Sequence, residues 1–208
     1  MNSTQPASDV IETLEQLDQL YERPPVQRAL DKVADHLTPL YRRWIESSRF
    51  CVLSTVGPEG TDASPRGDDG PVMRALDRHT LALPDWRGNN RLDSLRNIVR
   101  DGRVSLMFMV PGSDNVVRVN GSARLIADPE LTGEFEQNGK HPRSVVVVTI
   151  GEIYFQCAKA LMRSKLWTRG DDSGELPTAG EFLREADTEF DADSYDAGYP
   201  EYASTRMW

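Results

Sequence analysis

The sequence has few of the residues with which proteins usually bind metals or form disulfides. Its 208 residues include three histidines, His36, His79 and His141, and these are too far apart for metal-ligand spacing. Its two cysteines, Cys51 and Cys157, form no CxxC pair and have apolar or aromatic neighbours. We therefore expect no metal site, two buried thiols in place of a disulfide, and a reducing, cytoplasmic location.

Apolar segments long enough for a membrane are also missing. No run approaches the ~20 consecutive apolar residues that span a bilayer, and the N-terminus has neither the basic nor the apolar part of a signal peptide. There is no GxSxG motif and no GxGxxG after a strand, which leaves serine hydrolase and Rossmann dinucleotide-binding activities unsupported.

Positive charge is scarce near the C-terminus. The net charge is −9, and residues 171–201 hold eleven acids against one base, Arg184, so the rest of the chain is close to neutral. An acidic tail argues against general nucleic-acid binding, because phosphate attraction needs a positive face. A local anion site in the neutral part remains open.

The pattern of apolar residues predicts a mainly β fold with peripheral helices. Six strand candidates follow one another through mostly short connections, which favour an antiparallel barrel because parallel strands need long crossovers. Gly121 is expected to mark a bulge or a close backbone approach. The predicted strands are 50–56, 61–67, 79–85, 103–110, 116–126 and 144–157, and the predicted helices are 9–22, a stretch ending near 37, one from Thr38-Pro39, 91–101, one from Asp128-Pro129 and 179–188.

This pattern divides the chain into three parts. We expect N-terminal helices over 1–48 that pack on the barrel, the barrel itself over 49–170, and the acidic tail over 171–208. The last twenty residues could be flexible or could wrap a partner.

The segment 83–97 is the strongest candidate for an anion site. It leaves a strand, passes Gly88-Asn89-Asn90 and enters a helix near Arg91. Amides at a helix N-terminus attract anions, and arginine donates two parallel hydrogen bonds to phosphate. The alternative is an ordinary helix start whose surface arginines pair with Asp85 and Asp93.

Two further clusters carry weaker signals. Ser64, Arg66 and Gly67 could present a hydroxyl, a guanidinium and an accessible backbone to one anion or flat ligand. The alternative is a solvated turn with an Arg66–Asp68 ion pair. Arg118 and Asn120 share one face of a strand by period-2 alternation, and this face could line a ligand or simply meet solvent.

Five segments in order resemble the FMN-binding split-barrel superfamily of pyridoxamine 5′-phosphate oxidases, and within it a branch of FMN-dependent enzymes of unassigned substrate. The resemblance runs from about Leu20 to Trp167. It implies a six-stranded antiparallel split β-barrel and a homodimer with FMN at its interface. The segments are FCVLSTVGPEGTDASPRGD, TLALPDWRGNNRLDSLRNI, VSLMFMVPG, VRVNGSARL and YFQCAKALMRSKLW.

The resemblance also implies roles for individual residues. Basic and small polar groups would hold the phosphate or the flavin edge, backbone near the third strand would contact the ring, and the last segment would reach the flavin of the partner subunit. The implied cofactor-binding residues are Ser64, Arg66, Gly67, Leu83, Pro84, Asn89, Asn90, Arg91, Arg118, Asn120, Lys159, Arg163 and Lys165.

The chain departs from true pyridoxamine phosphate oxidases at two places. Pro65, Gly67 and Asp68 surround Arg66 where those enzymes have apolar residues after the arginine, and their C-terminal arginine–histidine segment has no match. Oxidation of vitamin B6 is therefore not expected. We expect an FMN-dependent oxidoreductase acting on a small substrate by hydride transfer, with NAD(P)H as a possible electron donor. The alternatives are an F420-dependent reductase of the same fold and a non-catalytic flavin- or haem-binding module.

Overall fold

The computed structural model describes residues 10–21 and 23–208 and divides the chain into two compact units, 1–32 and 33–208. The first unit contains α1 (Leu14–Leu20) and α2 (Gln27–Asp31). Thr13 caps α1 in a capping box with Gln16, so the helix starts later than predicted. The predicted helix was 9–22, and its residues 9 and 22 lie outside the described residues. The predicted boundary at residue 48 and the packing of the first helices on the barrel stay predictions.

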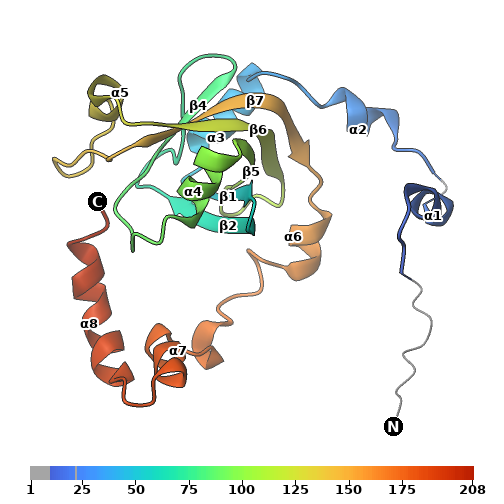
Figure 1. The fold of residues 1–208 in the computed structure, drawn as a ribbon. Coiled ribbons are helices and arrows are strands. Elements are labelled where there is room, and N and C mark those ends of the chain that lie inside the picture. Colours follow the sequence, from blue (N-terminus) through green and yellow to red (C-terminus); the bar gives the residue numbers. More distant parts are fainter. Residues whose placement is uncertain (1–9, 22) are drawn as a thin grey trace, which may run out of the picture. The chain divides into compact units, whose positions relative to one another are not determined.

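The second unit is built on one antiparallel sheet of seven strands in the order β2-β1-β5-β6-β7-β4-β3 (Figure 1). The predicted class, mainly β with peripheral helices, is confirmed. The seventh strand is the two-residue β3, which is too short to give a sequence pattern. The bounds are β1 Phe50–Gly57, β2 Gly60–Gly67, β3 Arg74–Ala75, β4 Thr80–Pro84, β5 Arg103–Met109, β6 Val116–Ile126 and β7 Val145–Gln156.

Local sequence explains two parts of this sheet. The turn between Gly57 and Gly60 folds β2 back on β1, with Phe50 opposite Gly67 at the far end. The long pair β6–β7 shifts register at Gly121, where an added Cβ would lie 2.1 Å from the carbonyl oxygen of Thr149. The close backbone approach predicted at Gly121 is therefore confirmed.

Helices lie around this sheet. Thr38 caps α3 with its side chain and Asp128 caps α5 in the same way, as the Thr-Pro and Asp-Pro pairs predict. None of the described helices is both long enough and apolar enough to cross a membrane. The remaining bounds are α3 Pro39–Ser47, α4 Asp93–Arg100, α5 Pro129–Gly133, α6 Lys159–Ser164, α7 Ala179–Ala186 and α8 Ala192–Ser204.

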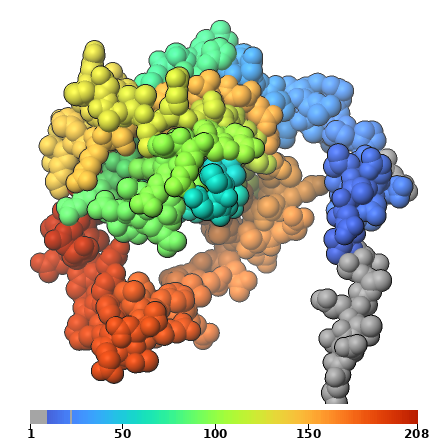
Figure 2. Space-filling model, in the orientation of Figure 1, coloured from blue at the N-terminus to red at the C-terminus, as the bar shows by residue number. Residues whose placement is uncertain are grey.

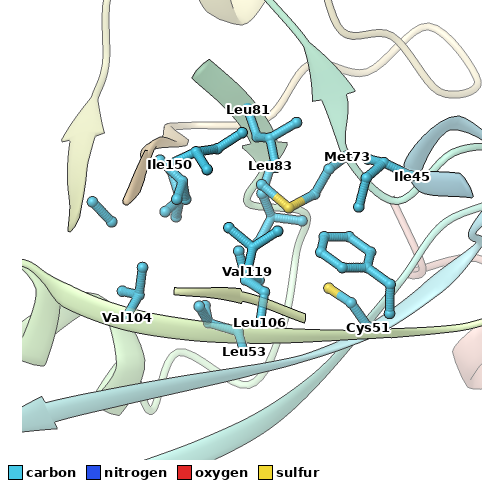
Figure 3. Close-up of a cluster of buried hydrophobic side chains, with 14 of the residues drawn as sticks. Ile45, Cys51, Leu53, Met73, Leu81, Leu83, Val104, Leu106, Val119 and Ile150 are labelled. Atoms are coloured by element: carbon cyan, nitrogen blue, oxygen red, sulfur yellow. The ribbon is translucent and has the colours of Figure 1, made fainter. Parts of the chain in front are cut away.

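The core is formed by buried side chains of the strands, and Ile45 of α3 packs among them (Figure 3); α4 contributes Ile98 to the same cluster. Alternate residues of β1, Cys51 and Leu53, are fully buried there, together with Ile45 of α3 and Ile98 of α4. Burial of Cys51 is as predicted. Cys157 is exposed, and its expected burial is wrong because β7 ends at Gln156, just before it.

A basic cavity at the split of the barrel

A cavity of about 1850 Å³ opens beside the edge strand β2 in the second unit. Its walls come from β2, the segment 85–95, the loop 140–144 and the C-terminal segment from Tyr195 to Trp208. Figure 2 shows the red end of the chain lying beside the green part of the barrel. Five predicted site residues line this one cavity: Ser64, Arg66, Asn89, Asn90 and Arg91.

Strand alternation directs the polar groups of β2 to the same side. Asp62, Ser64 and Arg66 are half-buried, whereas Ala63 and Pro65 between them are exposed. Because β2 is an edge strand, Pro65 is tolerated there although it has no N–H for a ladder. The sequence therefore places a carboxylate, a hydroxyl and a guanidinium in a row along the cavity.

Arg66 spans the gap between β2 and the end of β4. Its Nη1 donates to Oδ1 of Asp85 at 3.4 Å, and both side chains are largely shielded, with 25% and 19% exposed. Burial raises the pKa of Asp85, and the nearby Arg66 charge opposes this rise. The Arg66–Asp68 pair that was considered as an alternative is not what forms, since Asp68 accepts hydrogen bonds from Trp86 and Gln137.

The Nε of Arg66 is buried and has no hydrogen-bond partner among the described residues. A buried donor without an acceptor costs free energy, so such atoms usually await a ligand or water. The donor belongs to a residue that lines the cavity. One donor of the Arg66 guanidinium is therefore left for a further oxygen acceptor, such as an oxygen of an anion.

The start of α4 forms the second polar part of the cavity. Asn90 and Leu92 have φ values of 61° and 62°, in the left-handed region that residues other than glycine rarely adopt. Leu92 is the N-cap residue of α4. Its apolar side chain cannot accept a hydrogen bond from the first backbone amides of the helix. The helix begins at Asp93, two residues later than predicted, because of this left-handed turn.

Arg91 lies on the rim of the cavity. Its side chain is 80% exposed and its Nε donates to the carboxylate of Asp93, the pairing that was weighed as the alternative to phosphate binding. Its backbone N–H donates to Oδ1 of Asn89 at 3.0 Å. An exposed ion pair of this kind is weak, so it leaves Arg91 able to exchange its partner for a stronger anion.

The other predicted residues lie outside the lining of this cavity. Leu83 and Pro84 are buried in β4, and Gly67 ends β2. Arg118 and Asn120 lie on β6. The Cζ of Arg118 is 5.4 Å from the ring centroid of Tyr154, and the side-chain amide of Asn120 donates to Glu152 at 2.6 Å. Lys159 and Arg163 on α6 and Lys165 just after it are exposed.

Sequence reasoning missed one side of the cavity. The loop 140–144 was not singled out although its KHPR run is basic, and Arg87 lies directly before the predicted Gly88-Asn89-Asn90 turn. The tyrosines of α8 were not singled out, because they lie in the acidic segment, whose last twenty residues were expected to be flexible or to wrap a partner. The lining residues added by the structure include Lys140, Arg143, Tyr195, Tyr199, Tyr202, Arg206 and Trp208.

Comparison with known proteins agrees with this architecture. The sequence model described as pyridoxamine 5′-phosphate oxidase matches residues 37–157, more than half of the chain. The chain belongs to the pyridoxamine 5′-phosphate oxidase family. The family match covers all seven strands and includes the β2 and α4 sides of the cavity, whereas α8 lies beyond it.

Solved structures of low sequence identity are similar to part of this chain. HupZ of Group A Streptococcus is 16% identical with a TM-score of 0.48, covering 57% of this chain and 98% of its own. An FMN-binding protein of Syntrophomonas wolfei is 15% identical with a TM-score of 0.44, covering 68% and 97%. General Stress Protein 26 of Bacillus anthracis is 19% identical with a TM-score of 0.40, covering 54% and 88%. The comparison with curated proteins found no match.

Proposed function

We propose that the chain binds FMN in this cavity and is an oxidoreductase for a small substrate. The buried, partnerless Nε of Arg66 is the observation on which the proposal depends, because it calls for an oxygen acceptor beside the hydroxyl of Ser64. When bound, FMN supplies the hydride-accepting and hydride-donating ring, so no triad of protein side chains is needed.

The two polar parts of the cavity suit the two ends of the cofactor. Asn89, Asn90 and Arg91 at the start of α4 would hold the phosphate, where backbone amides and a guanidinium favour a dianion. Arg66 and Ser64, further along β2, would hold either the phosphate or the pyrimidine edge of the ring. A guanidinium at that edge favours the reduced, anionic ring.

A homodimer is part of the proposal. Arg118, Lys159, Arg163 and Lys165 do not line the cavity of their own chain. If they contact FMN, they do so in a second copy, which agrees with the interface position implied by the family resemblance. We expect light scattering to give twice the mass of one chain, and we expect the affinity for FMN to fall when the protein is diluted.

The test begins with the colour of the purified protein. We expect yellow protein that releases FMN on denaturation, identified by mass spectrometry, and flavin that NADH or NADPH bleaches and oxygen restores. If the protein takes up F420 but no FMN, F420 takes the place of FMN as the cofactor in this proposal. Bound flavin that no reductant bleaches would make the chain a flavin-binding module without turnover.

Two arginine variants locate the site. Arg66→Gln and Arg91→Ala should each weaken FMN binding by about 1.5–3 kcal/mol, as for loss of a charge-assisted hydrogen bond. Arg184→Gln, on α7 outside the cavity lining, is the matched control and should leave FMN affinity unchanged. Unchanged affinity in both cavity variants would place the cofactor elsewhere.

A further inference from the structure

Two histidines outside the cavity contact each other in the second unit. His36 belongs to the segment before α3 and His79 to the turn between β3 and β4, and their ring centroids are 5.7 Å apart with the rings tilted by 54°. Neither residue lines the cavity. The sequence predicted no metal site because its histidines are far apart along the chain, and the fold removes this objection for one pair.

One residue, Asp35, orients both rings. Its Oδ1 lies 2.7 Å from Nδ1 of His36, and its backbone carbonyl oxygen lies 3.2 Å from Nδ1 of His79. The hydrogen bond from His36 lowers the pKa of Asp35, so its carboxylate is charged at neutral pH and only accepts. Each Nδ1 therefore carries a proton, and the lone pair of the neutral ring is on Nε2. This is the tautomer of metal-binding histidines, whose other nitrogen donates to a carboxylate or a carbonyl.

Both Nε2 atoms are available to a ligand. Neither has a hydrogen-bond or ion-pair partner among residues 10–21 and 23–208. The side chain of His36 is 28% exposed and His79 is exposed, so an ion can reach the pair directly from solvent.

The backbone around the pair is held in place by long-range hydrogen bonds. The N–H of Leu37 donates to the carbonyl oxygen of Arg78 at 2.7 Å, which joins the residue after one histidine to the residue before the other. The carbonyl oxygen of His79 accepts from the N–H of Ile150 at 2.8 Å. A ligand between the two rings therefore has to order side chains only, and the loss of conformational entropy on binding is small.

The separation of the rings suits a shared metal ion. A Zn–N bond is about 2.0–2.1 Å long and the ring centroid lies about 1.1 Å behind Nε2, so each centroid lies about 3.2 Å from the ion. The centroids of two such rings are about 5.2 Å apart at the tetrahedral angle and about 6.4 Å apart when the rings oppose each other across the ion. The observed 5.7 Å lies between these two values.

The ligand type selects the class of metal. Imidazole nitrogen suits Zn²⁺, Cu²⁺ and Ni²⁺, whereas Mg²⁺ and Ca²⁺ prefer oxygen ligands. In the described part of the chain no group of three or more histidine, cysteine or carboxylate residues is placed to hold a metal ion. The protein therefore supplies two nitrogen ligands here, and water completes the coordination.

We propose that His36 and His79 form a two-histidine binding site for a divalent transition-metal ion such as Zn²⁺. The ion bridges the two Nε2 atoms and joins the segment before α3 to the β3–β4 turn. This inference goes beyond the proposed function and does not depend on it, because the pair lies outside the lining of the FMN cavity.

The first test is calorimetric titration of the full chain with Zn²⁺. It uses the Cys157→Ser background, because an exposed thiol is itself a zinc ligand. We expect one site per chain that an excess of Mg²⁺ does not displace. His36→Asn and His79→Asn should each weaken Zn²⁺ binding at least about tenfold, because the chelate loses one of its two ligands. Unchanged Zn²⁺ affinity in either variant overturns the proposal.

His141 is the matched control within the same chain. Its Nδ1 lies 2.6 Å from the carbonyl oxygen of Phe135, so it has the same tautomer, but neither of the other two histidine rings contacts it. His141→Asn should leave the Zn²⁺ affinity within about twofold of the parent chain. A loss as large as that in His36→Asn would mean that Zn²⁺ binds single histidines, which refutes the paired site.

A measurement on the chain without histidine substitutions removes any effect of such changes on folding. Diethyl pyrocarbonate acylates histidine nitrogen, and an ion bound at Nε2 blocks this reaction. We expect Zn²⁺ to slow the acylation of His36 and His79 about tenfold and to leave His141 reactive. Peptide mass spectrometry reads out the three sites separately. Equal protection of all three histidines, or protection of none, contradicts the site.

Discussion

Two donor nitrogens of Arg66 differ in their surroundings: Nη1 donates to Asp85, whereas Nε has no partner among the described residues. Asp85 therefore competes with any anion for the same guanidinium. Because its carboxylate is largely buried, its pKa is raised, and its charge adds unfavourably to an anion site. The balance between Asp85 and a ligand sets the affinity of this part of the cavity.

The variant Asp85→Asn tests that balance. The amide keeps the shape of the side chain but removes the competing charge, so we expect FMN to bind more tightly, by about 1 kcal/mol or less. Quenching of flavin fluorescence measures the dissociation constant. Asp171→Asn, which lies outside the cavity lining, is the control, and weaker binding in Asp85→Asn would show that Asp85 positions Arg66 and does not compete with the ligand.

The two cysteines should differ sharply in reactivity. Burial raises the pKa of the Cys51 thiol to about 12, whereas Cys157 is exposed. Since the thiolate is the reactive form, iodoacetamide at about pH 8 should modify Cys157 and leave Cys51 unmodified in the folded protein. Peptide mass spectrometry reads out the two sites, and both should react in urea. Labelling of Cys51 in the folded chain would contradict its burial.

Among the elements, the β6–β7 pair depends most on a single residue. At Gly121 the register shifts and the backbone of β7 comes within 2.1 Å of where a Cβ would be. The sequence predicted this from a glycine inside an otherwise β-rich segment. The bulge matters for the site because β7 holds β4 in the sheet, and β4 leads into Asp85.

We expect Gly121→Ala to destabilise the fold by about 3 kcal/mol or more, because the strands must separate to admit a methyl group. Urea unfolding followed by circular dichroism measures the loss. Gly133→Ala on α5, where nothing lies within 4 Å of the added Cβ, is the control and should be close to neutral. Equal stability of the two variants would show that the backbone of β7 moves at little cost to admit the added methyl group.

The α8 element shows where sequence patterns fail. Pro200 lies inside the helix and its apolar residues do not form a single stripe, so neither the period nor the composition predicts it. It forms beside α7, where Gly180 allows close packing and its backbone N–H donates to Asp196 at 2.8 Å. That contact joins residues sixteen positions apart and has no local signature.

At the scale of the whole molecule, several surface carboxylates tie stability to pH. Hydrogen bonds from Arg103 lower the pKa of Asp101 to about 2, and similar local bonds lower the pKa values of Asp35, Asp77 and Asp191. A carboxylate whose pKa is lower in the folded than in the unfolded chain stabilises the fold at pH values above its unfolded pKa of 3.8. This contribution is lost as the pH falls toward the folded-state pKa.

We therefore expect the urea midpoint to fall between about pH 5 and about pH 3. Asp101→Asn should lower the midpoint at about pH 5 and reduce the fall, since it removes the carboxylate whose pKa is lowered to about 2. Asp85, whose pKa is raised, acts in the opposite direction and partly offsets the fall. A urea midpoint that rises on acidification would show that the effect of Asp85 on stability is larger than that of the surface carboxylates.

The sequence by itself determined the antiparallel strands, the capped starts of α3 and α5, the bulge at Gly121 and the ordered motifs of the family. These follow from neighbours along the chain: alternation, caps and turn residues act within a few positions. It also named Ser64, Arg66, Asn89, Asn90 and Arg91, which the fold gathers around one cavity.

Only the tertiary structure decided which groups meet across the split. The Arg66–Asp85 pair, the partnerless Nε of Arg66 and the approach of Trp208 to Trp86 depend on contacts between segments distant in sequence. Such contacts form when burial and charge are balanced over the whole fold. No local pattern encodes that balance, which is why the approach of α8 to the cavity could not be foreseen.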